Sequence, residues 1–123
     1  IILGEKSFYL SIFEVDSGVD SGRVIDTRKF NYSKYDNIKS SYYKTTIIYA
    51  EMLNDFFVNL KSKRKNFKKQ DLKKASYLPK RLPEDGVMDW NQISEHLKNF
   101  VYALAHPYPG ATTILNKDIF IKI

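Results

Sequence analysis

The chain contains no cysteine among its 123 residues, which excludes disulfides and thiolate metal sites. No apolar run approaches the ~20 residues that a membrane-spanning helix needs. The first residues, Ile1 to Lys6, lack the basic start and long apolar core of a signal peptide. These absences exclude disulfide-stapled secreted proteins and helical membrane proteins. They fit a protein of the reducing cytoplasm.

What the chain does contain is typical of one small folded domain. Hydrophobic residues make up 43% of the sequence and aromatic residues 15%, which argues against disorder. The net charge of +6 has a single source, because residues 61–74 hold eight basic residues and one Asp. A run of this kind is more often a solvated helix end and loop than a binding surface. If it binds polyanions, we expect salt-sensitive contacts without base readout.

Residues 15–22 read VDSGVDSG, a tetrapeptide written twice between two apolar segments. Alternating apolar residues at 8, 10 and 12 predict a strand before it, and Val24 and Ile25 predict a second strand after it. The glycines and the Asp and Ser side chains predict a tight loop that holds Asp20 between Gly18 and Gly22. From the pattern alone, ordinary turn chemistry is the favoured explanation of such a loop. The spacing argues against a calcium loop of the EF-hand kind, because the third position from Asp16 is Gly18 and the twelfth is Thr27 instead of Glu.

Two helices and a hairpin are predicted downstream. Asp36 is a plausible N-cap for a helix of about six turns. Its expected core-facing stripe comprises Ile38, Tyr42, Thr45 or Thr46, Tyr49, Leu53, Phe56 and Leu60. Residues 70–86 have no sustained period and predict a surface linker. Asp89 is the expected cap of the second helix, with a stripe at Ile93, Leu97, Phe100, Val101 and Leu104 and with His96 on the surface. Residues 112–123 predict a β-hairpin.

Three separate blocks resemble one family. Residues 18–25 (GVDSGRVI) are similar to the aspartate loop of the formyltetrahydrofolate-dependent formyltransferases. Residues 79–90 (PKRLPEDGVMDW) look like the linker that follows the catalytic part in that family. Residues 103–111 (ALAHPYPGA) look like its R-A-x-x-P-[YW]-P-G-A signature. The blocks occur in the family's order and together cover nearly the whole chain.

The resemblance implies a mechanism that the pattern alone does not give. Such enzymes move a formyl group from formyltetrahydrofolate, the donor, to an amine, with no metal. Their catalytic set is an Asn, a His and an Asp, and Asp20 matches the Asp. The backbone of Val19 and Asp20 is expected near the pterin ring of the folate. Hydrogen-bond donors in fixed positions stabilise the oxyanion that forms on the formyl group. The acceptor amine, as an ammonium, must also lose a proton before it can attack.

One departure concerns the Asn and the His. In the family both precede the Asp, and nothing in this chain matches their motif. The only histidines, His96 and His106, follow Asp20. The chain also begins without methionine, in what looks like the middle of a sheet. We therefore expect a piece of a longer protein with an incomplete catalytic domain.

The resemblance leaves the acceptor amine open between two classes. Residues 80–90 look closest to enzymes that act on nucleotide-linked amino sugars. Methionyl-tRNA formyltransferases are the alternative, and residues 112–123 would then begin their small β-barrel. A non-enzymatic module that binds single-stranded nucleic acid is a third hypothesis. It expects aromatic residues interleaved with Lys, yet only Phe67 lies within the basic run.

The expected fold class is α/β. Residues 1–75 would form the C-terminal half of a three-layer, Rossmann-like formyltransferase domain. Residues 76–123 would supply a linker, a helix and a hairpin that begin a β-rich, barrel-like appendage. The expected partners are the folate cosubstrate and the amino sugar or methionyl-tRNA, and no membrane. A half-domain exposes a sheet edge, so we also expect association, with a homodimer as one form.

Overall fold

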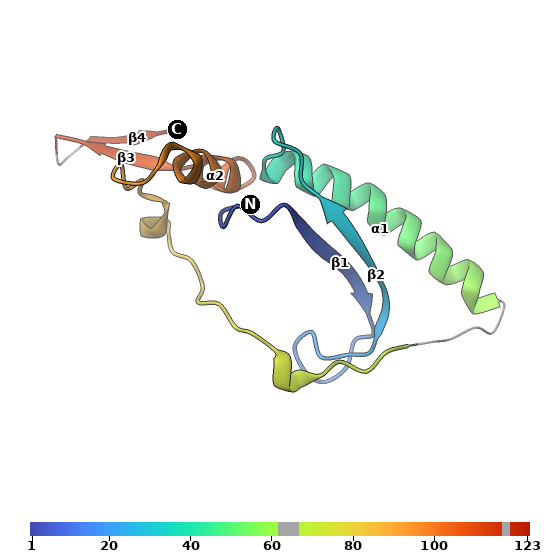
Figure 1. Cartoon of the computed structure of the whole chain (residues 1–123). Coiled ribbons are helices and arrows are strands. Elements are labelled where there is room, and N and C mark those ends of the chain that lie inside the picture. Colours follow the sequence, from blue (N-terminus) through green and yellow to red (C-terminus); the bar gives the residue numbers. More distant parts are fainter. Residues whose placement is uncertain (62–66, 117–118) are drawn as a thin grey trace. The chain divides into compact units, whose positions relative to one another are not determined.

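The computed structural model describes residues 1–61, 67–116 and 119–123. Its elements in chain order are β1 (Ser7–Phe13), β2 (Val24–Asn31), α1 (Ile38–Lys61), the 3-10 turns η1 (Leu72–Lys74) and η2 (Pro83–Gly86), α2 (Ser94–Leu104), β3 (Thr112–Leu115) and β4 (Ile119–Lys122). They form two compact units, each described by itself (Figure 1). Unit 1 contains residues 1–6, 32–43 and 79–123, and unit 2 contains residues 7–31 and 44–78. The small α/β character expected from the sequence is confirmed at this level.

Unit 2 is built on an antiparallel pair of strands, β1 and β2, joined by the VDSGVDSG loop. The register runs from Ser7 opposite Asn31 to Ile12 opposite Asp26, and a bulge follows just before the loop. Leu10 is buried, as the alternation in β1 predicts, and Phe30 of β2 is buried beside Phe8, with ring centroids 4.8 Å apart. The predicted strand–loop–strand is therefore confirmed. A bulge next to a loop bends the strand and redirects the side chains that follow it.

Helix α1 has 24 residues, close to the predicted length, but its cap and its buried face differ from the prediction. Asn37 is the cap, because its Oδ1 accepts the backbone N–H of Ser40 at 3.0 Å while Ser40 Oγ accepts the N–H of Asn37 at 3.1 Å. Asp36 instead closes the preceding turn and accepts from the Ser33 N–H at 2.8 Å. The cap thus lies one residue later than predicted.

The buried face of α1 runs through Ser41, Thr45, Ile48, Met52 and Phe56. Met52 is fully buried. Of the predicted stripe, Ile38, Thr45, Phe56 and Leu60 are half-buried as expected. Tyr42, Tyr49 and Leu53 are instead 47%, 39% and 46% exposed. The reason is that α1 carries large apolar side chains on two neighbouring faces, so periodicity alone does not identify the face that packs on the strands.

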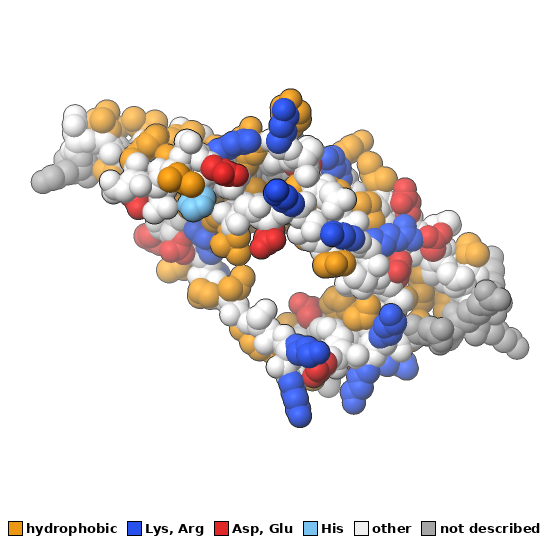
Figure 2. All heavy atoms as spheres, in the orientation of Figure 1, with side chains coloured by type: hydrophobic (Ala, Val, Ile, Leu, Met, Phe, Trp, Pro, Cys, Tyr) orange, Lys and Arg blue, Asp and Glu red, His pale blue; other side chains and the backbone are white. Residues whose placement is uncertain are grey.

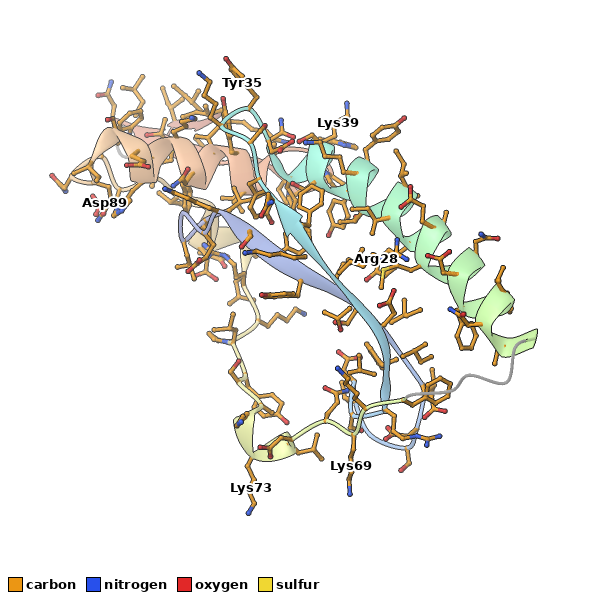
Figure 3. The ribbon with its side chains drawn as sticks, turned by 45° about the vertical axis from the view of Figure 1, so that its right-hand side comes forward. Arg28, Tyr35, Lys39, Lys69, Lys73 and Asp89 are labelled. Atoms are coloured by element: carbon orange, nitrogen blue, oxygen red, sulfur yellow. The ribbon has the colours of Figure 1, made fainter. Side chains whose placement is uncertain are left out.

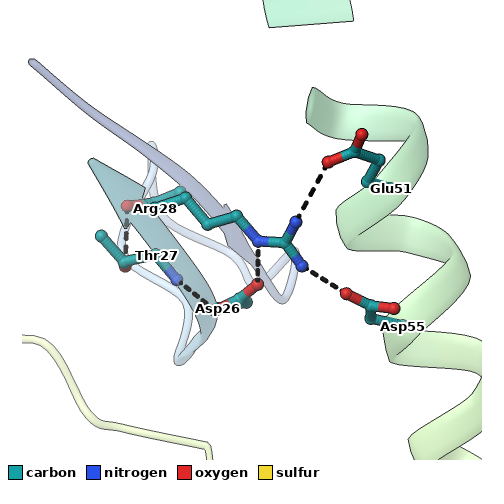
Figure 4. Close-up of polar contacts among 6 residues, drawn as sticks. Asp26, Thr27, Arg28, Glu51 and Asp55 are labelled. Atoms are coloured by element: carbon teal, nitrogen blue, oxygen red, sulfur yellow. Dashed lines mark hydrogen bonds and ion pairs between the residues drawn. The ribbon is translucent and has the colours of Figure 1, made fainter. Parts of the chain in front are cut away.

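An arginine on β2 connects the strands to α1 within unit 2. The Arg28 guanidinium bonds to the carboxylates of Asp26 at 3.2 Å and Glu51 at 3.5 Å and also to that of Asp55 (Figures 3 and 4). The hydrogen bond to Asp55 is the main cause that raises the pKa of Arg28. Because the Arg28 side chain is about one third exposed, these ion pairs add little to stability. Their main role is to fix the orientation of α1 relative to β2.

Unit 1 has its own small core, in which Met88 and Ala111 are buried. Helix α2 begins at Ser94 with Ile93 as its cap residue, so the predicted Asp89 cap is wrong. The Asp89 carboxylate organises the turn before the helix instead, accepting from the N–H of Asn91 at 3.0 Å. Ile93 is 61% exposed and does not belong to the packed face of α2, whereas His96 is exposed as predicted.

The predicted C-terminal hairpin is confirmed as β3 and β4, with Thr112 opposite Lys122 and Leu115 opposite Ile119. Residues 117 and 118 of its turn lie outside the described residues. All of β4 is exposed. The N–H of Met88 bonds to the carbonyl of Thr112 at 2.8 Å, which ties residues 86–88 to β3.

Candidate active site

The loop between β1 and β2 owes its compact form to Asp16. The Asp16 carboxylate accepts the N–H of Gly18 at 3.0 Å and the hydroxyl of Ser21 at 2.7 Å. Asp and Ser stabilise turns through such bonds to nearby groups. Gly22 is required for another reason, because a Cβ at this position would lie 1.7 Å from the backbone oxygen of Glu14. The two copies of the tetrapeptide therefore differ in role: Asp16 of the first copy accepts hydrogen bonds within the loop, and Gly22 of the second copy allows the close approach to Glu14.

The base of the loop is closed by Glu14 and Arg23. The N–H of Glu14 bonds to the carbonyl of Arg23 at 3.0 Å. The Arg23 guanidinium donates Nε to Glu14 Oε2 at 2.5 Å and Nη2 to Glu14 Oε1 at 2.9 Å. This paired hydrogen bonding raises the pKa of Arg23, with the Coulomb attraction of Glu14 as the second cause.

A segment far along the chain forms a third side of the loop. Val24 and Lys68 exchange backbone hydrogen bonds of 2.8 and 2.9 Å. Phe67 packs against Phe56 of α1 with ring centroids 6.4 Å apart, and the Arg23 guanidinium lies 5.2 Å from the Phe67 ring centre. Phe67 is thus engaged in packing inside unit 2. It is not the free stacking surface that the nucleic-acid hypothesis needs.

Gln70 completes this contact. Its side-chain Nε2 donates to the backbone carbonyl of Asp20 at 2.8 Å and to that of Gly22 at 2.6 Å. Sequence reasoning missed this residue, because Gln70 stands at the start of the segment interpreted as a linker. The available signal was weak: a single amide side chain within the basic run.

Asp20 itself lies at the exposed end of the loop, in the left-handed region with φ of 52°. Asp and Asn tolerate this region better than most residues. Within the described part of the chain, the Asp20 carboxylate has no hydrogen-bonding or ionic partner, although its backbone carbonyl is held by Gln70. Val19, the other predicted site residue, is 93% exposed beside it. The structure therefore brings both predicted residues together, with a carboxylate and an apolar side chain facing solvent.

The two histidines belong to unit 1. His96 is on α2, where its Nδ1 lies 3.4 Å from Gln92 Oε1. His106 follows the helix and is exposed. In the described ranges, no group of three or more His, Asp or Glu side chains is arranged to hold a metal ion. The same residues include no helix that is long and apolar enough to cross a membrane.

The basic run is exposed where it is described. Lys68, Lys69, Lys73 and Lys74 are all exposed, and Figure 3 shows Lys69 and Lys73 pointing away from the chain. Figure 2 shows several basic side chains standing out along the face in view. Residues 62–66 lie outside the described residues. These solvated lysines fit the interpretation of the basic run as a solvated helix end and loop.

Unit 1 contains a largely apolar cavity of about 600 Å³. Two of the three sequence blocks meet around it, since its lining includes Arg81, Leu82, Pro83 and Gly86 from one and Tyr108, Pro109 and Gly110 from the other. The Tyr108 hydroxyl lies 2.8 Å from that of Tyr42. This hydrogen bond is the main cause that raises the pKa of Tyr108.

Comparison with known proteins agrees with the sequence blocks. Residues 81–123 match a family described as "Formyl transferase, C-terminal domain". The chain resembles the formyltransferases. The bifunctional polymyxin resistance protein ArnA of Wigglesworthia glossinidia brevipalpis is 32% identical over 98% of this chain. The methionyl-tRNA formyltransferase of Geobacter metallireducens is 28% identical over 94%. The resemblance predicted from the motifs is thereby confirmed.

A solved structure shares the fold. A likely sugar N-formyltransferase from Mycobacterium tuberculosis, Rv3404c, aligns with 99% of this chain at a TM-score of 0.75 and 20% identity. The chain spans 19% of the ArnA relative, 37% of the Geobacter relative and 54% of the solved structure. It therefore corresponds to a part of each of these proteins.

Proposed function

We propose that the full-length protein containing this chain is a formyltransferase, which moves a formyl group from formyltetrahydrofolate to an amine. The observation that carries the proposal is the Asp20 loop. Its sequence resembles the family's aspartate loop, and its backbone is held from both sides while the carboxylate of Asp20 stays exposed. An acid–base group must reach its substrate, and a fixed backbone limits the positions that the carboxylate can take.

Asp20 would act on the proton of the incoming amine. The ammonium loses a proton, the free amine attacks the formyl carbon, and the bond from that carbon to the folate nitrogen breaks as the nitrogen takes up a proton. Asp20 assists this proton transfer and keeps a neighbouring histidine charged. The Asn and His that stabilise the oxyanion would come from outside this chain. The exposed Val19 side chain and the adjoining backbone suit contact with the flat pterin ring of the folate.

We assign residues 1–75 to the C-terminal part of a three-layer, Rossmann-like catalytic domain. Residues 76–123 would begin the C-terminal, β-rich subdomain. The family match over residues 81–123 supports the second assignment, and the strand–loop–strand–helix order of residues 7–61 supports the first.

For the acceptor, we favour a nucleotide-linked amino sugar. The form of residues 80–90 supports this choice. Methionyl-tRNA is the second candidate, supported by the 28% identity to the Geobacter enzyme. Phe67 packs against Phe56 and Arg23 and is not free to stack on a base, which argues against a non-enzymatic nucleic-acid module.

Asp20→Asn in the full-length protein tests the proposal. Asn keeps the shape and tolerates the left-handed backbone, so the variant changes the charge alone. We expect formyl transfer to fall about 100-fold or more, with an unchanged circular dichroism spectrum. Assays with a panel of nucleotide-linked amino sugars and with methionyl-tRNA would identify the acceptor. Turnover near that of the wild type would reduce the loop to an ordinary turn.

A further inference from the structure

We propose that Gln70 is a positioning residue for the transfer reaction, which sets the backbone of Asp20 and through it the reach of the carboxylate. The inference rests on the proposed function. The two carbonyls that Gln70 contacts belong to Asp20 and Gly22, on either side of Ser21. A donor to both fixes the path of the chain through the residue that carries the chemistry.

The chemistry of the side chain suits this role. One amide nitrogen carries two hydrogens, so it can donate to two carbonyl oxygens at once. Its distances to the Asp20 and Gly22 oxygens, 2.8 and 2.6 Å, are those of hydrogen bonds, the second shorter than is usual for N–H···O. Carboxylates and apolar side chains have no such donor. Gln70 is therefore specified by its chemistry as well as by its size.

The position of Gln70 is fixed by the segment that carries it. The two backbone bonds between Lys68 and Val24 set this segment beside the base of the loop. Phe67, packed on Phe56, anchors it to α1. Gln70 is half-buried, so water competes less for its amide than it would at a fully exposed site. The contact spans 50 residues of sequence and links the loop to the part of the chain after α1.

The left-handed backbone of Asp20 explains why a clamp is needed. An L-residue at φ of 52° is in a sparsely populated conformation, which persists where the surroundings hold it. Asp16 holds the first half of the loop through Gly18 and Ser21. Gln70 holds the second half. Its removal would let Asp20 relax toward commoner backbone angles and move its carboxylate.

Gln70→Glu in the full-length protein is the sharpest test. It preserves volume and replaces the donor by an oxygen that repels both carbonyls. Displacement of a reacting group by ~1 Å can cost about 100-fold, so we expect kcat to fall about 10- to 100-fold with the KM for the amine within about threefold. Gln70→Met, which lacks the donor but adds no charge, should give a loss in the same direction. Gln92→Glu is the matched control: it also replaces an amide donor by a repelling oxygen, but at the Asp89 carboxylate, away from the Asp20 loop, and it should retain wild-type turnover.

A double-mutant cycle separates positioning from general damage. If Gln70 acts through Asp20, adding Gln70→Glu to Asp20→Asn should cost no further turnover, within about twofold. Losses that multiply would overturn the inference, because Gln70 would then act independently of Asp20. Hydrogen exchange of the Gly18 to Gly22 amides supplies a readout other than activity. It should quicken in Gln70→Glu and not in Gln92→Glu, and unchanged exchange would also overturn the inference.

The two failures are distinguishable. If Asp20→Asn alone keeps full turnover, the proposed function of the loop fails, and the positioning role falls with it. If Asp20→Asn loses turnover while Gln70→Glu and Gln70→Met keep it, the proposed function stands and only the role of Gln70 is wrong.

Discussion

Asp20 in unit 2 and Asp89 in unit 1 both lie in turns next to regular elements, yet the two turns use their aspartates in opposite ways. The Asp89 carboxylate accepts three hydrogen bonds: from the backbone N–H of Asn91 at 3.0 Å, from the side-chain amide of Asn91 at 2.9 Å and from the side-chain amide of Gln92 at 3.1 Å. The Asp20 carboxylate has no such partner among the described residues, and its turn is held through the backbone. The Asp89 carboxylate stabilises its own turn, whereas the Asp20 carboxylate extends from its turn into solvent.

The same contrast holds inside the loop itself. Asp16 and Asp20 occupy equivalent places in the repeated tetrapeptide, but Asp16 bonds to Gly18 and Ser21 as Asp89 bonds to its own neighbours. A carboxylate committed to local N–H and O–H donors has little capacity left for a substrate. The comparison therefore supports Asp20, rather than Asp16, as the residue for acid–base chemistry.

Gly22→Ala should have the largest effect on the fold of the loop. The added Cβ would lie 1.7 Å from the backbone oxygen of Glu14, and a backbone atom cannot move aside as a flexible side chain can. We expect unfolding free energy to fall by about 2 kcal/mol or more, or the loop to open. Gly86→Ala is the control, because its Cβ would meet Gly110 O at an ordinary 3.6 Å. Urea unfolding of both variants measures the difference, and equal small losses would contradict this account.

Asp16→Ala should have a smaller effect, on the first half of the loop. The variant removes the acceptor for Gly18 and Ser21, which are exposed hydrogen bonds, so we expect a loss of about 1 kcal/mol or less. Turnover should fall less than in Asp20→Asn, because the Asp20 carboxylate is retained. Kinetics of the two variants side by side would test this order. A greater loss in Asp16→Ala would reverse the assignment of roles.

The sequence predicted the elements better than it predicted their contacts. Alternation in residues 8–12 and the glycines of the loop identified β1, β2 and the position of Asp20, because these signals are local. The buried face of α1 was predicted only in part, at Thr45 and Phe56, since Tyr49 and Met52 are both apolar and only the folded structure distinguishes the buried Met52 from the exposed Tyr49. Gln70 could not be predicted either, because its partners lie 48 and 50 residues earlier and no local pattern records them.

The same reasoning applies to Asp89, whose capping position the pattern predicted wrongly. A cap was expected because Asp precedes the helix, but its first donor is Asn91, two residues on, which forms a turn before the helix begins. Local competition between a turn and a cap is decided by a few tenths of a kcal/mol to about 1 kcal/mol, below what a sequence pattern can discriminate.

Asp89→Asn should have the smallest effect, and it tests the other side of the comparison. The Asn91 backbone N–H, followed by the Gln92 and Asn91 side chains, lowers the pKa of Asp89. A carboxyl group whose pKa is lowered by folding stabilises the fold above its unfolded value near 4, and this contribution is lost as pH falls through the folded value. Asp89→Asn should therefore lower the Tm slightly at pH 6 to 7, and the difference from wild type should shrink below about pH 4.

Thermal unfolding of both proteins from pH 7 to pH 3 measures this difference in Tm. A difference that stays constant across that range would mean that the Asp89 charge does not stabilise its turn, and the contrast with Asp20 would lose one of its two sides.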